Sequence, residues 1–278
     1  MSEPEWRRLN RANWDERVPL HLKSLLHYDQ TDLRAGNGRV DPIAAAVLGS
    51  IGGMRILHLQ CHFGMDSLAL AQQGGFVTGV DFSIPAIDAA SALARELGLA
   101  DRTRFVVSDV YDTEATLGEA DRFDCVFVSW GALCWLPDIA GWARVVARQL
   151  KPGGWLALAD AHPTAYVFDS RAAAPDGRPG WWLPYFGHEP MIEDGTEDYA
   201  DPDAVLRNTR THQWLHPLGD IIAALLDAGL VLKRFDEHDA IPWQMFDCLV
   251  RGEDRFYRWP DTPWLPLSFS LRAEKPYA

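Results

Sequence analysis

The sequence is short of basic residues and of cysteines. Its 26 lysines and arginines stand against 39 aspartates and glutamates, a formal charge of −13, and no Lys/Arg-rich run occurs. The chain therefore lacks the attraction to phosphate backbones on which nucleic-acid binders rely. The four cysteines, Cys61, Cys125, Cys134 and Cys248, show neither a CxxC pair nor the spacing of metal ligands. We expect reduced thiols, no nucleic-acid partner and no metal centre.

Long apolar runs are also missing. No run reaches the roughly 18 residues that a membrane span needs, and the first residues are too polar for a signal peptide. The sequence therefore predicts a cytoplasmic protein with no membrane partner. Its 278 residues, 47% of them hydrophobic, suffice for a large core without disulfides. The oligomeric state stays open, a homodimer included.

Short apolar runs alternate with helical patterns over much of the chain. The expected strands are Arg55–Leu59, Phe76–Val80, Thr103–Val107, Phe123–Ser129 and Trp155–Ala159. Five such strands separated by helices predict an α/β protein with a parallel sheet covered on both faces. Right-handed crossovers make this sheet doubly wound, with ligands at the carboxyl ends of its strands.

The ends of the chain depart from this alternation. Residues 1–50 are polar and helical in pattern, whereas residues 161–212 are rich in Pro, Gly, Trp and His and predict an irregular insertion. A helix at 217–229 and a strand at 231–238 follow. The tail 267–275 alternates apolar and polar residues, which predicts a half-buried strand. The long connection before it suits an antiparallel pair at the edge of the sheet.

The loop Gln60 to Gly64 stands between the first strand and a helix, where a Rossmann-like sheet binds its nucleotide. Such loops normally use glycines for the turn and for close approach of the backbone to the ligand, but only Gly64 is present. Asp81 ends the second strand, where a carboxylate can accept hydrogen bonds from both ribose hydroxyls. Asp109 ends the third strand, where a carboxylate can accept from an adenine amino group.

Five motifs in order carry a family resemblance. They are LHLQCHFG at 57–64, VDFS at 80–83, VVSDV at 106–110, FDCVFVSWGALCWLPD at 123–138 and LKPGGWLALAD at 150–160. In this order and spacing they resemble the class I S-adenosylmethionine-dependent methyltransferases, and the LQCHFG loop resembles a subgroup of bacterial small-molecule enzymes. The resemblance implies a Rossmann-like sheet of seven strands, mostly parallel with the last antiparallel. It also implies a helical lid at 1–50 and a methyltransferase domain at 51–278, with a substrate-side insertion at 161–216.

The resemblance also implies S-adenosylmethionine as cofactor and a set of contacts to it. The expected contacts are Trp14, Arg17, His58, Gln60, Cys61, His62, Gly64, Asp81, Phe82, Ser83, Ser108, Asp109, Val110, Ser129 and Trp130. The loop departs from the family where an aspartate becomes His58 and two glycines become Gln60 and His62. The last two offer side-chain groups to the methionine carboxylate. If either needs a positive φ, strain of about 1–2 kcal/mol is stored there.

Histidines near the strand ends are candidates for a general base, because imidazole titrates near neutrality. His162 is the favoured candidate, since it follows the fifth strand, and His188 and His216 are weaker ones. A structural role is the competing interpretation for each. His58 and His62 are not expected to form a zinc pair, because they lie on a strand and a loop instead of one helix face.

The aromatic content suggests a pocket wall. The tryptophans expected to line a substrate pocket are Trp130, Trp135, Trp181, Trp182 and Trp214. The function expected is methyl transfer to an O, N or S nucleophile of a small molecule. Two alternatives stay open: a non-catalytic S-adenosylmethionine-binding protein, and a nicotinamide-dependent oxidoreductase, which the missing GxGxxG disfavours.

Overall fold

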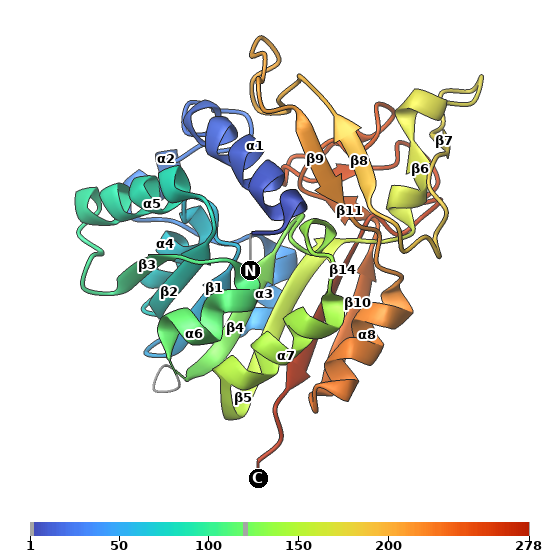
Figure 1. Ribbon diagram of the computed structural model, residues 1–278. Coiled ribbons are helices and arrows are strands. Elements are labelled where there is room, and N and C mark those ends of the chain that lie inside the picture. Colours follow the sequence, from blue (N-terminus) through green and yellow to red (C-terminus); the bar gives the residue numbers. More distant parts are fainter. Residues whose placement is uncertain (1–2, 119–121, 278) are drawn as a thin grey trace.

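The computed structural model describes residues 3–118 and 122–277 of the chain (Figure 1). Three helices precede the first strand: α1 (Glu5–His21), α2 (Thr31–Arg34) and α3 (Pro42–Leu48). The start of α3 follows from its sequence, because the Asp41 carboxylate accepts hydrogen bonds from the backbone N–H groups of Ile43 and Ala44. Pro42 occupies the first helical position, as its sequence favours, but the helix ends at Gly49, at φ 71°, before the Gly52-Gly53 pair at which it was expected to stop.

A seven-stranded sheet forms the centre of the molecule, in the order β10-β14-β5-β4-β1-β2-β3. Its strands are β1 (Arg55–Leu59), β2 (Phe76–Asp81), β3 (Thr103–Val107), β4 (Phe123–Ser129), β5 (Leu150–Ala161), β10 (Val231–His238) and β14 (Ser268–Glu274). Neighbours among β1 to β5 are parallel, and β14 is antiparallel to both β5 and β10. The predicted mostly parallel sheet with an antiparallel last strand is confirmed.

Helices cover both faces of the sheet (Figure 1). They are α4 (Met65–Gln72), α5 (Ile84–Glu96), α6 (Thr113–Leu117), α7 (Ile139–Gln149) and α8 (Leu218–Asp227). Alternate residues of a strand point to opposite faces. Accordingly, Leu57 of β1 packs in one core cluster with Trp142 of α7 and Ile221 of α8. Its neighbour Ile56 packs in another cluster that α3 and α4 contribute to.

The fifth strand is longer than predicted. The Lys-Pro-Gly-Gly stretch was expected to end a helix and precede the strand, but β5 already begins at Leu150, whose pairing partner is Phe123. The register then shifts before Cys125 pairs with Trp155. The glycines therefore lie in an irregular part of the strand.

The two segments expected to be irregular contain short strands. Residues 161–216 hold η3 (Ala165–Val167), η4 (Ser170–Ala172) and two small sheets, β6 (Phe168–Asp169) with β7 (Gly180–Trp181) and β8 (Met191–Asp194) with β9 (Arg210–Gln213). A three-stranded sheet of β11 (Ala240–Ile241), β13 (Tyr257–Arg258) and β12 (Val250–Arg251) precedes β14. Together they form a layer above the carboxyl ends of the central strands, with α1 beside β9 (Figure 1). None of the helices in the described part of the chain is long and apolar enough to cross a membrane.

Candidate cofactor site

The loop after β1 adopts a strained backbone. Gln60 and His62 have φ values of 54° and 51°, in the left-handed region that non-glycine residues rarely adopt. Hydrogen bonds to β2 hold this conformation: Cys61 N–H donates to the Val80 carbonyl over 3.0 Å, and His62 N–H donates to Asp81 Oδ2 over 2.8 Å. The strain considered for these positions is present, and it lies where a ligand is expected.

Gly64 is the position in the loop that cannot change. Its φ is 78°, and a Cβ built there would lie 2.7 Å from the Phe105 ring of β3. Glycine is therefore required by close packing as well as by conformation. Gly64 caps the start of α4, which directs the helix N-terminus at the loop.

Only one of the two polar atoms of the Gln60 side-chain amide has a hydrogen-bond partner among the described residues. Its Nε2 donates to the Ala132 carbonyl over 2.8 Å, beyond the end of β4, which fixes the direction of the amide. Its Oε1 is buried and has no hydrogen-bond partner among the described residues. A buried acceptor without a partner is costly, and a ligand with a positively charged donor would satisfy it.

We expect two substitutions at Gln60 to separate its two roles. Gln60→Ala and Gln60→Gly both remove the amide, but only glycine relieves the left-handed strain. Urea denaturation should therefore find Gln60→Gly more stable than Gln60→Ala by about 1 kcal/mol. Equal stabilities would show that the φ of 54° stores no strain.

Asp81 organises the turn after β2. Its Oδ2 accepts from His62 N–H, and its Oδ1 accepts from Ser83 N–H over 2.9 Å. Burial raises the pKa of Asp81 to about 6, while these backbone hydrogen bonds act to lower it. Ser83 caps α5, and its hydroxyl donates to Asp15 of α1 over 2.6 Å. The intervening Phe82 is half-buried.

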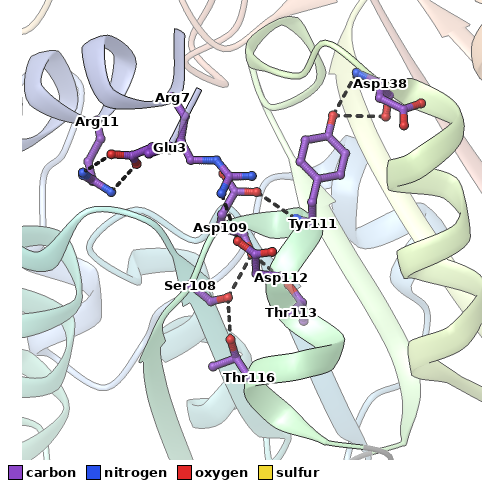
Figure 2. A network of polar contacts seen from close by, with 10 residues as sticks. All are labelled: Glu3, Arg7, Arg11, Ser108, Asp109, Tyr111, Asp112, Thr113, Thr116 and Asp138. Atoms are coloured by element: carbon purple, nitrogen blue, oxygen red, sulfur yellow. Dashed lines mark hydrogen bonds and ion pairs between the residues drawn. The ribbon is translucent and has the colours of Figure 1, made fainter. Parts of the chain in front are cut away.

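Asp109, after β3, is covered by an arginine that sequence reasoning missed (Figure 2). Arg7 Nε of α1 lies 2.9 Å from Asp109 Oδ2, and Arg7 Nη1 donates to Asp112 over 3.0 Å. The other oxygen of Asp109 accepts from Tyr111 N–H. Burial raises the pKa of Asp109 and Arg7 acts to lower it. The N-terminal helix therefore contacts Asp109 through Arg7, and through Asp15 it contacts Ser83, two residues after Asp81.

The neighbours of Asp109 are used internally. The Ser108 hydroxyl is 2.9 Å from the Thr116 hydroxyl, within hydrogen-bond distance, and also donates to the Asp109 carbonyl (Figure 2). Val110 begins η1 (Val110–Asp112) and packs into the core. Their side chains shape the end of β3, and a ligand there would meet backbone groups.

Two residues at the end of β4 are tied to helices on one face of the sheet. Ser129 donates to Asp66 Oδ2 of α4 over 3.0 Å. Trp130, at φ 43°, donates from Nε1 to Asp41 Oδ2 over 2.6 Å and packs edge-on against Trp243. These contacts account for both side chains without a ligand.

His58 and Cys61 are packed inside the protein. The His58 ring lies against Phe127, with Nδ1 2.8 Å from the Ser67 hydroxyl. Burial lowers the pKa of His58 to about 3, so its imidazole is neutral. Cys61 is buried, which raises the pKa of its thiol. The side chains of His58 and Cys61 therefore support the loop by packing inside the protein.

His162, the predicted base, is held by protein groups. Its Nδ1 accepts from Thr164 N–H, and its Nε2 lies 3.0 Å from Glu237 Oε1 of β10 without hydrogen-bond geometry. Burial lowers its pKa, and Glu237 acts to raise it. Its role as a base stays a prediction, and these contacts favour a structural one. The other two candidates, His188 and His216, lie beside Asp220 and the Leu136 carbonyl.

A buried cluster joins the loop to α1 and to the insertion. His21 Nδ1 lies 2.8 Å from His62 Nε2, and His21 Nε2 lies 3.1 Å from Asp198 Oδ2. The predicted lid residue Arg17 pairs with the same Asp198 oxygen over 2.8 Å. Trp14, the other predicted lid residue, packs edge-on against the His62 ring. Trp14, Arg17 and His62 were named from the sequence as cofactor contacts, which stays a prediction, and the structure brings them together with His21 and Asp198, which were not named.

The comparisons with known proteins find a methyltransferase domain in the part of the chain that contains the loop after β1 and the ends of β2, β3 and β4. Residues 56–154 match the family described as a methyltransferase domain. The ubiquinone biosynthesis O-methyltransferase of Pseudomonas aeruginosa (strain LESB58) is 30% identical over 160 residues, which are 56% of this chain and 61% of that protein. The chain thus covers less than two thirds of that relative.

Two solved structures share the fold. The S-adenosylmethionine-dependent methyltransferase from Mesorhizobium loti superposes with a TM-score of 0.60 at 23% identity, covering 84% of this chain and 96% of that one. The [4+2]-cyclase SpnF gives a TM-score of 0.57 at 17% identity, covering 95% of each chain. Residues 56–154 therefore match a methyltransferase domain, and the sheet that contains them has the Rossmann-like fold seen in S-adenosylmethionine-dependent methyltransferases.

Proposed function

We propose that this protein transfers the methyl group of S-adenosylmethionine to an O, N or S nucleophile of a small molecule. The observation that carries the proposal is the set of acceptors at the carboxyl edge of the matched domain: the Asp81 and Asp109 carboxylates and the unpaired Oε1 of Gln60. The relatives' names point to the same reaction and cofactor. The LQCHFG loop would then mark a bacterial subgroup of such enzymes.

The acceptors fit the cofactor group by group. Gln60 was expected to serve the methionine carboxylate, but its Nε2 donates to the Ala132 carbonyl. The remaining Oε1 suits the methionine ammonium instead, because a cationic donor compensates a buried acceptor. Asp81 suits the ribose hydroxyls, and Asp109 the adenine amino group, once Arg7 shares or releases its carboxylate. The cofactor supplies an electrophilic methyl group on a sulfonium. The protein's part is to align the acceptor atom with that methyl and to exclude water.

A hollow beside η2 (Leu133–Trp135) supports a small-molecule substrate. Its volume is about 300 Å³, and it lies between η2, β9 and the insertion. Cys134, Tyr166, Leu183, Met191, Trp214 and Leu215 are among its lining residues. Of the other tryptophans expected there, Trp181 and Trp182 are exposed, and Trp135 packs against Trp14. An apolar hollow of this size suits a drug-sized or smaller apolar molecule.

Filling this hollow is expected to block substrates selectively. In β8, Met191 lines the hollow, whereas the next residue, Ile192, is exposed on the other side of the strand. Met191→Trp should lower turnover of accepted substrates at least about tenfold, a loss of about 1.4 kcal/mol in transition-state binding. Ile192→Trp is the matched control, and both should bind S-adenosylhomocysteine like the wild type. If Met191→Trp and Ile192→Trp turn over alike, the substrate lies elsewhere.

The remaining expectations belong to the same proposal. Residues 1–50 act as the lid, residues 161–216 form the substrate side of a domain spanning 51–278, and the enzyme works in the cytoplasm on small molecules. The contacts of Arg7 and Asp15 with the two strand ends support the lid role.

Isothermal titration calorimetry with S-adenosylmethionine and S-adenosylhomocysteine tests the proposal. We expect both to bind, and formation of S-adenosylhomocysteine over a panel of alcohols, phenols, amines and thiols to reveal turnover. If neither ligand binds, the proposal fails. Binding without turnover over the panel would favour a non-catalytic role or another reaction on the same fold, which the [4+2]-cyclase SpnF also has. A titration with NADH tests the oxidoreductase alternative, and no binding is expected.

A further inference from the structure

The cluster around His21 is a continuous chain of polar contacts from the insertion to the loop after β1. Asp198, from the insertion, contacts His21 at the end of α1, and His21 contacts His62 in the loop. The side chains of His21 and Asp198 have no exposed surface, so water does not interrupt the chain. His21 and Asp198, which are 177 positions apart in the sequence, are thereby connected to the loop after β1, which we propose holds the cofactor.

The positions of the protons in this chain follow from its chemistry. A carboxylate only accepts hydrogen bonds, so His21 Nε2 must carry a proton toward Asp198. The 2.8 Å contact between His21 Nδ1 and His62 Nε2 needs one proton between the two nitrogens. Either His62 donates to a neutral His21, or a doubly protonated His21 donates to His62. In both cases Nδ1 is the atom of His62 left for a ligand.

In the two arrangements His62 Nδ1 offers a ligand opposite hydrogen-bonding character: it is an acceptor in the first and a donor in the second. When His62 donates from Nε2 and is neutral, its Nδ1 carries a lone pair and repels a carboxylate. When His21 is doubly protonated and donates to His62 Nε2, a neutral His62 carries a proton on Nδ1 and attracts one. Conversion of the first arrangement to the second takes up one proton from solvent. The bridging proton moves onto His21 Nδ1, and the new proton goes to His62 Nδ1.

The charges around the chain favour the neutral arrangement until an anion arrives. The Arg17 guanidinium already balances Asp198, so a cationic His21 adds an uncompensated buried charge. Burial lowers the pKa of His62, His21 acts in the same direction, and Asp198 opposes both. The other titratable groups packed against the rings are Tyr28 and Tyr199, whose hydroxyls hydrogen-bond to each other, with His27 beside Tyr199. Asp81 contacts the His62 backbone.

We propose that Asp198 and His21 are positioning residues that set the proton on His62 Nδ1, and that the methionine carboxylate of the cofactor binds there with uptake of one proton. This inference rests on the proposed function and extends it, because it assigns to the insertion a role in cofactor binding. Asp198 is needed to stabilise the cationic His21 that the bound state contains. The lid, the insertion and the loop thus respond together to the anion.

Calorimetry on the full-length protein tests this without any turnover. S-adenosylhomocysteine, which has the same methionine end, is titrated at pH 8 in phosphate and in Tris, whose ionisation enthalpies differ. The difference in heat gives the protons taken up, and at pH 8 Asp81 is already ionised. We expect wild type to take up about one proton more than Asp198→Asn, and Asp198→Asn to bind about tenfold more weakly. Glu197→Gln, which removes a neighbouring exposed carboxylate, should behave like wild type.

A double-mutant cycle separates positioning from mere structural support. If Asp198 acts through His62, Asp198→Asn should change affinity less than about twofold in a His62→Gln background. The same loss in both backgrounds, or proton uptake in Asp198→Asn equal to wild type, would overturn the inference. If Asp198→Asn does not fold, as judged by its thermal midpoint, His21→Gln replaces it, since it removes the ring that connects Asp198 to His62. Absence of binding to wild type would instead remove the proposed function, and this inference with it.

Discussion

Replacement of Asp81 by alanine is expected to abolish measurable binding of S-adenosylmethionine and S-adenosylhomocysteine. The carboxylate has two tasks, because it would accept from the ribose and it already accepts from His62 N–H and Ser83 N–H. Hydrogen bonds to a charged group contribute about 1.5–3 kcal/mol each. Loss of two of them weakens binding at least about 100-fold. The loop after β1 would also lose the contact that holds His62 at positive φ.

Calorimetry with both ligands measures this effect. Asp88→Ala serves as the matched control, because Asp88 is an exposed carboxylate on the neighbouring α5. It should bind both ligands within about twofold of wild type. An Asp81→Ala protein that binds within tenfold of wild type would mean that Asp81 only shapes the turn.

The pH dependence of binding follows from the same group. Burial raises the pKa of Asp81 to about 6, so the carboxylate gains its proton as the pH falls through 6 and loses acceptor strength. In the Asp198→Asn background, where the proton uptake proposed for His62 is removed, affinity for S-adenosylhomocysteine should therefore fall between pH 7 and pH 5. Stability changes in the opposite sense: the folded protein holds this proton more tightly than the unfolded chain, whose Asp pKa is near 3.9. The contribution of Asp81 to stability accordingly declines as the pH rises from about 4 to about 6.

A second buried carboxylate provides the control for this titration. The pKa of Asp66 is also raised to about 6 by burial, with Asp41 acting in the same direction and Ser129 opposing both. Asp66→Asn should remove part of the pH dependence of stability but leave the pH dependence of ligand affinity unchanged. If the pH dependence of ligand affinity disappears in Asp66→Asn, that dependence is due to Asp66 and not to Asp81.

The sequence was a good guide wherever the structure depends on local pattern. The strands and the acidic residues Asp81 and Asp109 at strand ends depend on short-range features, and the structure has them where the sequence predicts, apart from the earlier start of β5. The left-handed backbone at Gln60 and His62 was foreseen only conditionally, because no glycine marked it. The φ values follow from hydrogen bonds to β2, which lies outside the loop.

The contacts that close the site could not be predicted in the same way. Arg7 with Asp109, and His21 with Asp198, are pairs of side chains from distant segments, and neither leaves a periodic pattern in the sequence. The insertion was expected to lack regular structure because strands of two to four residues are too short to show alternation. The role proposed for Gln60 Oε1 could be inferred only from the structure, in which the atom is buried and has no hydrogen-bond partner among the described residues.

The largest loss of stability is expected at Asp160, which was not singled out from the sequence. This buried carboxylate at the end of β5 accepts from the N–H groups of Gly131 and Ala161 through Oδ1. Its Oδ2 accepts from the N–H groups of Ala132 and Leu133. These hydrogen bonds act to lower the pKa of Asp160, but burial outweighs them and raises it. One side chain thus satisfies four amides and fixes the turn after β4.

Asp160→Ala leaves these four buried donors without their partner, and we expect a loss of about 3–5 kcal/mol in the free energy of unfolding. For a chain of this size this corresponds to a fall of roughly 10 °C in the thermal midpoint. Asp124→Ala is the control at the opposite end of β4, where the carboxylate is half-buried and accepts from Arg55 N–H and Lys151, and it should cost only about 1 kcal/mol. The same turn contains the Ala132 carbonyl that orients Gln60. The fraction of Asp160→Ala protein that still folds should therefore bind S-adenosylhomocysteine more weakly than wild type. Equal stability of the two variants would show that water replaces the carboxylate, and that the turn after β4 does not depend on it.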